Sequence, residues 1–473
     1  YEERGNKLHL MSDFDAEARK EAGNSWFGGW AGDCFDKVVC DPVREQVYYR
    51  NSHVFDLKTG ESLGSFSPKT QCVFDDMAFD KRGYMHLHFN PCFFGQGVGR
   101  VDPSRAQVET DKSGNKMLQY PECPYDYGVE ARGWLGSLPV KDQPGAKGFQ
   151  DGLGVTMRGE IVSESNIYYV PKMEEEGLAL AIEGGTARKQ SGAYDDSRRN
   201  SYDFLMNEIM EKQKRGEEIY SIKRKPGIPL SGGTAWTYDA NGELRRECAV
   251  IAGDLVNGVQ MDEDHGIYFI NARPRLFNEK SFLYGKAGKF GTNNRTHPFT
   301  GTLIKTAPDK ECSVVLTGAS VPVDELPKRP PEVAALNYMS DAYMNKGSWC
   351  WVEGADWLYA GASPIVDVGC SCPRQHLGLD WYKRVYVPEA YRHSIGILDT
   401  SGNLIMHVGS YGNFDDAPGG KNGAKPGAED IRIMLTRFIS ATDNYLVYGD
   451  WAEKLVVLKL AYQAEETVGI GGK

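Results

Sequence analysis

One pattern recurs along this chain and limits what it can fold into: small and apolar residues, an acidic turn, then an aromatic-rich alternating run. It turns at Asp41 in KVVCDPVREQVYYRN, at Asp80 in DMAFDKRGYMHLHFN and at Asp262 in NGVQMDEDHGIYFIN, with further copies at Asp380 and Asp443. Looser copies are GLGVTMRGEIVSESN and SWCWVEGADWLYAGA. Each copy predicts two antiparallel strands joined by a tight turn in which the acidic side chain accepts backbone N–H bonds.

A second hairpin pattern follows several of these copies and completes a four-stranded unit. Its turns run from Asp56 to Gly60, from Asp239 to Gly242 and from Asp399 to Gly402, with glycine where the backbone needs a positive φ. The 54 Gly, 25 Tyr and 9 Trp of the 473 residues also favour many strands and turns. A four-stranded antiparallel unit repeated around an axis is a β-propeller. We therefore expect an all-β propeller of six or seven blades, formed by the chain as a single domain.

Two stretches interrupt the repeat. The segment 172–225 is charged and favours helix, so it predicts a mostly helical insertion in one blade. The segment 273–345 contains FGTNNRTHPFTGTL and a Pro-rich run, and predicts a loop-rich insertion. The helical insertion either packs on the ring or serves as a docking arm. Its apolar stripe would consist of Tyr202, Phe204, Leu205, Ile209 and Met210.

The stretch from Leu377 to Asn413, LGLDWYKRVYVPEAYRHSIGILDTSGNLIMHVGSYGN, resembles an NHL repeat. Together with CSCPRQH before it and LKLAYQAEETV near the C-terminus, it also resembles large secreted NHL-type proteins. The family often has glycine where this chain has Lys383. The resemblance implies a propeller, in a family that includes protein- and RNA-binding scaffolds and peptidyl-amidating lyases with a metal in the channel.

Charge and cysteine usage narrow the partners and the compartment. A net charge of -11 argues against a nucleic-acid surface, and no run of apolar residues is long enough for a membrane span. Ten scattered cysteines without a C-x-x-C motif fit disulfides in a secreted or periplasmic protein. The chain begins at Tyr1, which suggests a processed product or part of a longer chain.

The candidate metal ligands come in short groups. Cys370 and Cys372 are two residues apart, so both face one side of an extended chain, and His376 follows them. The three residues could bind a transition metal, or the cysteines could form disulfides. His86 and His88 share one strand face, either as metal ligands or as structural residues. A calcium site in MDEDHG would use Asp262, Glu263 and Asp264, although this loop lacks the ligand pattern of an EF-hand.

No complete catalytic motif is present, which favours an interaction or assembly module within a larger homo- or hetero-oligomer. A first alternative is a metal-dependent lyase or hydrolase with its site in the propeller channel. A second alternative is a carbohydrate-binding propeller, because tryptophans near strand ends either fill the wedges between blades or offer stacking surfaces. These tryptophans are Trp26, Trp30, Trp349, Trp351, Trp357 and Trp451.

Overall fold

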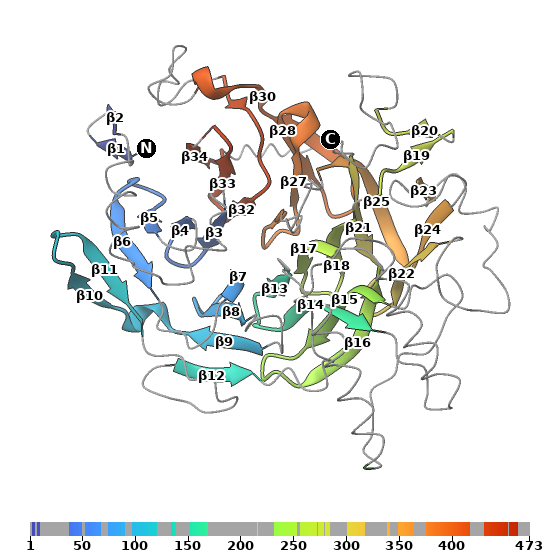
Figure 1. The fold of residues 1–473 in the computed structure, drawn as a ribbon, viewed down its shortest axis with the longest axis horizontal. Helices are drawn as coiled ribbons and strands as arrows, with labels where there is room; N and C mark the ends of the chain where they lie inside the picture. Colours follow the sequence, from blue (N-terminus) through green and yellow to red (C-terminus); the bar gives the residue numbers. More distant parts are fainter. Residues whose placement is uncertain are drawn as a thin grey trace, which may run out of the picture.

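Six antiparallel sheets follow one another around a ring in the computed structural model, in the order of the sequence (Figure 1). The structure describes residues 2–4, 7–9, 37–49, 53–67, 74–89, 97–120, 134–138, 152–168, 215, 231–252, 256–271, 273–278, 280–283, 300–316, 338–340, 349–363, 375–416, 430–452 and 454–461. The fold is a six-bladed all-β propeller, so the expected class is confirmed and the blade number is the lower of the two expected.

Each blade begins at the ring axis and runs outward. Blade 1 comprises β3 (Val38–Asp41), β4 (Gln46–Tyr49), β5 (His53–Asp56) and β6 (Ser62–Ser67), and blade 2 comprises β7 (Phe74–Phe79), β8 (Met85–Phe89), β9 (Gly97–Val101) and β12 (Trp134–Leu138). Blade 3 comprises β13 (Leu153–Val155), β14 (Ile161–Tyr168), β15 (Ser231–Tyr238) and β16 (Leu244–Ile251), and blade 4 comprises β17 (Val256–Met261), β18 (Ile267–Asn271), β21 (Gly301–Thr306) and β25 (Ala355–Ala362). Blade 5 comprises β26 (Gly378–Leu379), β27 (Val385–Glu389), β28 (Ser394–Leu398) and β29 (Leu404–Val408), and blade 6 comprises β32 (Ile439–Ala441), β33 (Tyr445–Asp450) and β34 (Lys454–Lys459).

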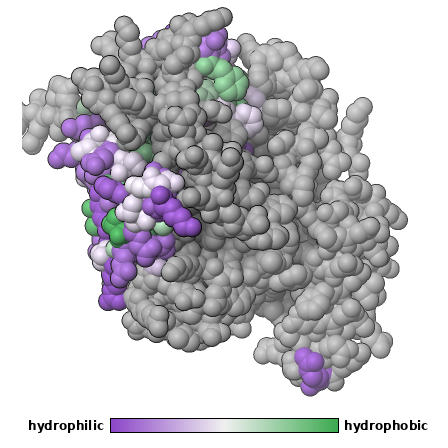
Figure 2. Space-filling model, turned by 60° about the vertical axis from the view of Figure 1, so that its left-hand side comes forward, coloured by the Kyte–Doolittle hydropathy of each residue, from purple (hydrophilic) through white to green (hydrophobic). Residues whose placement is uncertain are grey.

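Two blades carry extra strands on their outer edges. The hairpin of β10 (Gln107–Thr110) and β11 (Lys116–Gln119) adds to β6 of blade 1, with β11 parallel to β6. On blade 3, β22 (Cys312–Leu316) lies parallel to β16 and is followed outward by β24 (Trp349–Glu353) and β23 (Tyr338–Ser340). Figure 2 turns the side of β10 and β11 forward, and its described surface is mainly hydrophilic.

Short elements complete the described structure. Three two-stranded pairs are β1 (Glu2–Arg4) with β2 (Lys7–His9), β19 (Leu276–Phe277) with β20 (Lys280–Ser281), and β30 (Ser410–Tyr411) with β31 (Arg432–Ile433). Helical segments within the described ranges are limited to the 3-10 turns Pro103–Arg105, Ala390–Arg392 and Phe414–Asp416. No helix in these ranges is long and apolar enough to cross a membrane.

The expected inserts have different outcomes. The helical insertion at 172–225, with its apolar stripe, lies outside the described residues except for Arg215. The range 273–345 contains β21, the third strand of blade 4, and the outer strands β22 and β23 of blade 3. Part of the range expected to be a loop-rich insertion therefore belongs to the ring, because GTLIKT and CSVVL are short β-forming runs that the neighbouring Pro-rich stretch obscures.

The first turn of each blade is built around one side chain, as the repeat predicts. Asp41, Asp80, Asp262 and Asp380 each accept two backbone N–H bonds from their own turn at 2.8–3.1 Å. Blade 6 differs from the expectation, because Thr442 and not Asp443 accepts the N–H groups of Asn444 and Tyr445. In blade 3, Thr156 takes the same place and accepts from Glu160. We call these six positions the turn residues, and the end of the ring that carries them the turn face.

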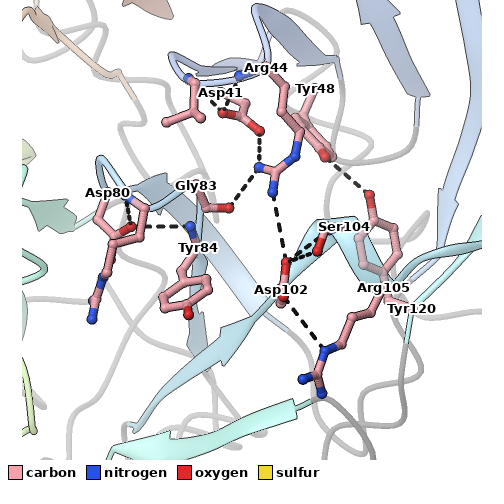
Figure 3. A network of polar contacts seen from close by, with 12 residues as sticks. Asp41, Arg44, Tyr48, Asp80, Gly83, Tyr84, Asp102, Ser104, Arg105 and Tyr120 are labelled. Carbon is pink, nitrogen blue, oxygen red and sulfur yellow. Dashed lines mark hydrogen bonds and ion pairs between the residues drawn. The ribbon is translucent and has the colours of Figure 1, made fainter.

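Contacts between neighbouring turns run around the turn face. The Arg44 guanidinium donates to the Asp41 carboxylate at 2.7 Å and to the Gly83 carbonyl of blade 2 at 2.8 Å (Figure 3). Lys81 N–H reaches the Met157 carbonyl of blade 3, and further pairs join Lys383 to Asp264 and Asn444 to Glu45. The last of these pairs links blade 6 to blade 1 and so joins the two ends of the ring.

Apolar side chains fill the wedges between blades. Val39, Met77 and Leu87 belong to the cluster between blades 1 and 2, and Ala78, Leu153 and Trp236 to the next one. Trp236 and Trp351 are among the largest fully buried side chains, so these two tryptophans belong to the core.

The described cysteines are all buried, and no disulfide joins any two of them. Burial raises the pKa of the Cys40 and Cys312 thiols to about 12. Thiols with so high a pKa stay protonated and are poor nucleophiles. The other six cysteines, Cys34, Cys72, Cys92, Cys123, Cys370 and Cys372, lie outside the described residues, so the disulfide expectation for them stays a prediction.

Short and long connections occur at both ends of the ring. At the turn face, short turns such as Asp80–Tyr84 and Asp380–Arg384 join most strands, and the connections from β9 to β12 and from β21 to β25 are long. At the opposite end, which we call the long-connection face, the chain leaves β14 at Tyr168 and returns to β15 at Ser231. Long connections also separate β18 from β21 and β25 from β26 at this face.

Candidate functional site

The residue four positions before each turn residue lies at the same level of all six innermost strands. We call these six residues the axial layer. Because equivalent positions of all blades lie around the same part of the axis, the side chains of this layer fill the centre of the ring. The six residues are Lys37, Asp76, Gly152, Gly258, His376 and Phe438.

Two glycines in this layer make room for the charged side chains of the other blades. A Cβ at Gly152 would lie 2.0 Å from the Glu164 Cβ, and a Cβ at Gly258 would lie 2.8 Å from the Gln375 carbonyl oxygen. Neither position therefore accepts a side chain without moving its neighbours. The side chains of this layer therefore come from the other four blades.

Lys37 and Asp76 form a buried ion pair between blades 1 and 2. The Lys37 Nζ lies 3.3 Å from Asp76 Oδ1, and the two side chains are 3% and 0% exposed. The carboxylate also accepts the N–H of Met77 at 2.9 Å and the N–H of Leu153, in blade 3, at 3.0 Å. Lys37 additionally lies over the Phe438 ring of blade 6, 5.8 Å from its centroid. Such a pair is retained only where its hydrogen bonds are made, because desolvation of two charges is costly.

His376 joins the other half of the ring. Its Nε2 lies 2.7 Å from Gln260 Nε2 of blade 4, and its Nδ1 lies 3.4 Å from the Ile439 carbonyl oxygen of blade 6. An amide N–H that donates to Nε2 assigns the proton to Nδ1, where the carbonyl accepts it. This assignment leaves Nε2 as the acceptor nitrogen of the ring.

All six blades therefore meet at one point on the axis. We call this group the axial cluster, and it consists of Lys37, Asp76, the Leu153 N–H, Gln260, His376 and the Ile439 carbonyl. Its two halves approach each other across the channel, where His376 Nε2 is 4.0 Å from Asp76 Oδ2. That separation is too long for a hydrogen bond, but a water or hydroxyl between the two atoms could bond to both.

An axial cavity of about 80 Å³ lies on the turn-face side of this cluster. Gln260 and His376 line its inner end, and the walls include Val39, Ala78 and Leu379. Four of the six residues two positions before the turn residues are small, namely Ala78, Gly154, Gly378 and Ser440, which explains why the centre is hollow at this level. A cavity of this size holds several water molecules or a small organic molecule.

Of the residues proposed from sequence, His376 belongs to this site and the other described ones lie elsewhere. His86 is fully buried, with Nε2 3.2 Å from Asp80 Oδ2, and His88 Nε2 lies 3.2 Å from Ser163 Oγ. Burial lowers the pKa of His86, while His86 and Arg82 hold the pKa of Asp80 at about 2, although burial opposes this shift. These two histidines contact different partners within the blade wedges.

The calcium candidates belong to the turn of blade 4. Asp262 caps its own turn and accepts the Tyr268 hydroxyl at 2.8 Å, Glu263 accepts the Met157 N–H at 2.5 Å, and Asp264 pairs with Lys383. The three carboxylates thus have separate protein partners. Cys370 and Cys372 lie outside the described residues, as do the docking residues Tyr202, Phe204, Leu205, Ile209 and Met210.

The described residues of the site fit a metal poorly. No group of three or more His, Cys, Asp and Glu side chains converges anywhere in the described part of the chain. At the axis only Asp76 and His376 are of ligand type, and the Lys37 ammonium 3.3 Å from Asp76 would repel a cation there. The donor set instead suits an uncharged polar molecule or water.

Comparisons with known proteins yield similarity of structure only. No protein-family model matches the chain, and no curated protein matches it either. Among solved structures, the calcium-binding protein regucalcin from Agrobacterium tumefaciens is 8% identical, with a TM-score of 0.32 over 87% of this chain and 80% of that one. A gluconolactonase from Xanthomonas campestris is 10% identical, with a TM-score of 0.31 over 90% and 86%.

A third structure is the PQQ-bound aldose sugar dehydrogenase from Streptomyces coelicolor, 10% identical with a TM-score of 0.33 over 90% of each chain. Similarity at this level says nothing about the substrate or activity of this chain. The resemblance to NHL repeats extends to the propeller fold, and no family is assigned.

Proposed function

We propose that this protein binds a small molecule on the propeller axis and acts on it by acid–base chemistry, as a hydrolase or lyase. The observation that carries the proposal is the position of His376, which belongs to the axial cluster and also lines the axial cavity. Apolar side chains fill the wedges between blades, whereas Lys37, Asp76 and His376 lie at the centre of the ring. Buried ionisable groups beside a cavity are typical of functional sites.

The chemistry follows from the arrangement. A water or substrate hydroxyl between His376 Nε2 and Asp76 Oδ2 would be held by both atoms. Once this hydroxyl has replaced the Gln260 amide at Nε2, His376 would accept its proton, while Asp76 orients the hydroxyl and Lys37 balances the carboxylate charge. The Ile439 carbonyl, 3.4 Å from Nδ1, would hold the imidazole in the tautomer that this step needs.

Turnover of a panel of small esters, amides and hydroxy acids, followed by proton NMR, tests this proposal. We expect at least one compound to be converted, and the His376→Gln variant to lose about two orders of magnitude in rate. The matched control is His407→Gln, which changes a half-buried histidine on β29, far from the axis in sequence and sheet order. Equal rates for His376→Gln and the native protein would contradict the proposal.

A second candidate function is an interaction or assembly module, as the sequence suggests. Long connections at both ends of the ring support it, because rigid frames with long loops serve recognition. The proposed docking residues lie outside the described structure. Deletion of residues 190–222, followed by light scattering with co-purifying proteins, tests this role, and unchanged mass and partner recovery would refute it.

A further inference from the structure

We infer that the axial cavity takes a small uncharged molecule with one hydrogen-bonding end, and that this molecule enters from the turn face. The inference rests on the proposed function and names the ligand class of the same site. Four features of the described residues carry it: the closed channel, the paired charges, the polar inner end and the volume.

The channel is closed on the other side of the cavity. His376 from blade 5 and Asp76 from blade 2 approach to 4.0 Å across the axis, and Lys37 and Gln260 flank them. No organic molecule passes between two polar atoms at that distance. A ligand in the cavity therefore enters between the first turns, where Trp381 and Lys383 line the opening.

The charged residues that line the cavity already have partners. Asp380 pairs with Arg384, Glu263 pairs with Arg158 at 3.4 Å, and Lys383 pairs with Asp264. Asp262 accepts the Tyr268 hydroxyl and backbone N–H groups. A charged ligand would lose its hydration and would have to compete with these partners for the charges of the lining, so an uncharged ligand is favoured.

The inner end offers both a donor and an acceptor. Gln260 supplies an amide, and His376 supplies a nitrogen that accepts, the two being 2.7 Å apart. A ligand amide or hydroxyl can replace this contact by bonding to both side chains. Val39, Met77, Ala78 and Leu379 offer apolar contact on another part of the wall, which suits a short aliphatic or small cyclic body.

The volume limits the ligand to a few heavy atoms. About 80 Å³ accommodates several waters, so a ligand of roughly five to eight heavy atoms fits. Molecules of this size bind weakly, and a dissociation constant in the millimolar range is expected.

Three probes of nearly equal size and different charge test the inference: butyramide, butyrate and butylamine. Saturation-transfer NMR and protein titration should show butyramide binding, with the two charged probes about tenfold weaker or worse. Ala78→Leu fills the cavity and should abolish butyramide binding, whereas Ala240→Leu, in an outer turn of blade 3, should leave it unchanged. Equal binding of all three probes, or binding unaffected by Ala78→Leu, would overturn the inference.

A second variant covers the case in which Ala78→Leu does not fold. Gln260→Leu removes the amide of the polar inner end but keeps the volume, so butyramide should bind about tenfold more weakly while xenon, detected by ¹²⁹Xe NMR, still enters. Unchanged butyramide binding in this variant would overturn the polar-end assignment. Because these are binding measurements, they are independent of turnover: binding without conversion refutes the proposed function alone, and conversion without selective binding of butyramide refutes this inference alone.

Discussion

Lys37 is the residue whose burial is hardest to explain by packing. Its ammonium lies in the centre of the ring beside Asp76, and each charge is tolerated there because the other is present. Three donors surround Asp76, so the pair also ties blades 1, 2 and 3 together. Removing the charge of either Lys37 or Asp76 alone should therefore lower the free energy of unfolding more than removing both charges.

We expect Lys37→Met to destabilise the fold by about 3–5 kcal/mol, because the Asp76 charge remains buried without its cation. The double variant Lys37→Met with Asp76→Asn should recover a large part of that loss. Urea denaturation followed by circular dichroism gives the free energy of unfolding for each protein. A double variant less stable than the single one would show that the charges do not depend on each other.

Asp80 predicts how stability responds to acid. His86 and Arg82 hold its pKa at about 2 in the folded protein, against 3.8 ordinarily. Because the pKa is lowered in the folded protein, the ionised Asp80 carboxylate stabilises the fold. This contribution to the free energy of unfolding is fully present above about pH 4 and is lost as the pH falls from there toward 2. The contribution amounts to about 2 kcal/mol. Denaturation curves from pH 7 to pH 2 should therefore fall less steeply for Asp80→Asn, and parallel curves would contradict this role.

The sequence predicts single residues of this site unevenly. His376 was found because it follows a Cys-x-Cys motif, whereas Lys37, Asp76 and Gln260 carry no motif at all. Their signal is positional: Lys37, Asp76 and His376 each precede a turn residue by four places. This offset can be counted only when the turn residue of every blade is known. Blades 3 and 6 hide theirs from a search for aspartate, because they use Thr156 and Thr442.

At the scale of elements, the repeated hairpins were predictable and the additions to the blade edges were not. The turns from Asp56 to Gly60, from Asp239 to Gly242 and from Asp399 to Gly402 form as expected. The hairpin β10–β11 has ordinary polar strands, and its docking on β6 depends on a close approach that no local pattern records. A Cβ at Gly64 would lie 2.5 Å from the Lys116 carbonyl oxygen of β11.

Gly64→Ala should therefore release the β10–β11 hairpin from blade 1. Gly64 has φ +122°, so alanine also introduces backbone strain there. Gly60→Ala is the matched control, because Gly60 has φ +72° and nothing within 4 Å of its added Cβ. We expect hydrogen exchange at Met117–Gln119 to accelerate at least tenfold in Gly64→Ala only. Equal protection in both variants would show that β11 does not depend on this contact.

At the scale of the whole molecule, the ring is closed by contacts between blades 6 and 1. The Cys40 N–H donates to Ser440 Oγ at 2.9 Å in a buried setting, and Asn444 bonds Glu45 at the turn face. Since each blade packs against its neighbours, weakening this junction should lower the stability of the whole ring.

Ser440→Ala leaves the Cys40 N–H buried without its acceptor, which should cost about 1–3 kcal/mol. We expect near-ultraviolet and far-ultraviolet circular dichroism to report one shared transition at lower denaturant, as for a cooperative ring. Two separated transitions, with one group of blades melting first, would show that the blades unfold independently.

The layer that holds Lys37, Asp76 and His376 also makes the centre of the ring a place where side chains can be substituted by design. Four of its six positions carry side chains, while Gly152 and Gly258 are closed to any addition by Glu164 and the Gln375 backbone. Four positions that can be changed therefore remain, one each in blades 1, 2, 5 and 6, and each precedes the turn residue of its blade by four places. Exchanging Lys37 and Phe438 for carboxylate or imidazole side chains would convert the same frame into a ligand set for a metal, without altering a strand.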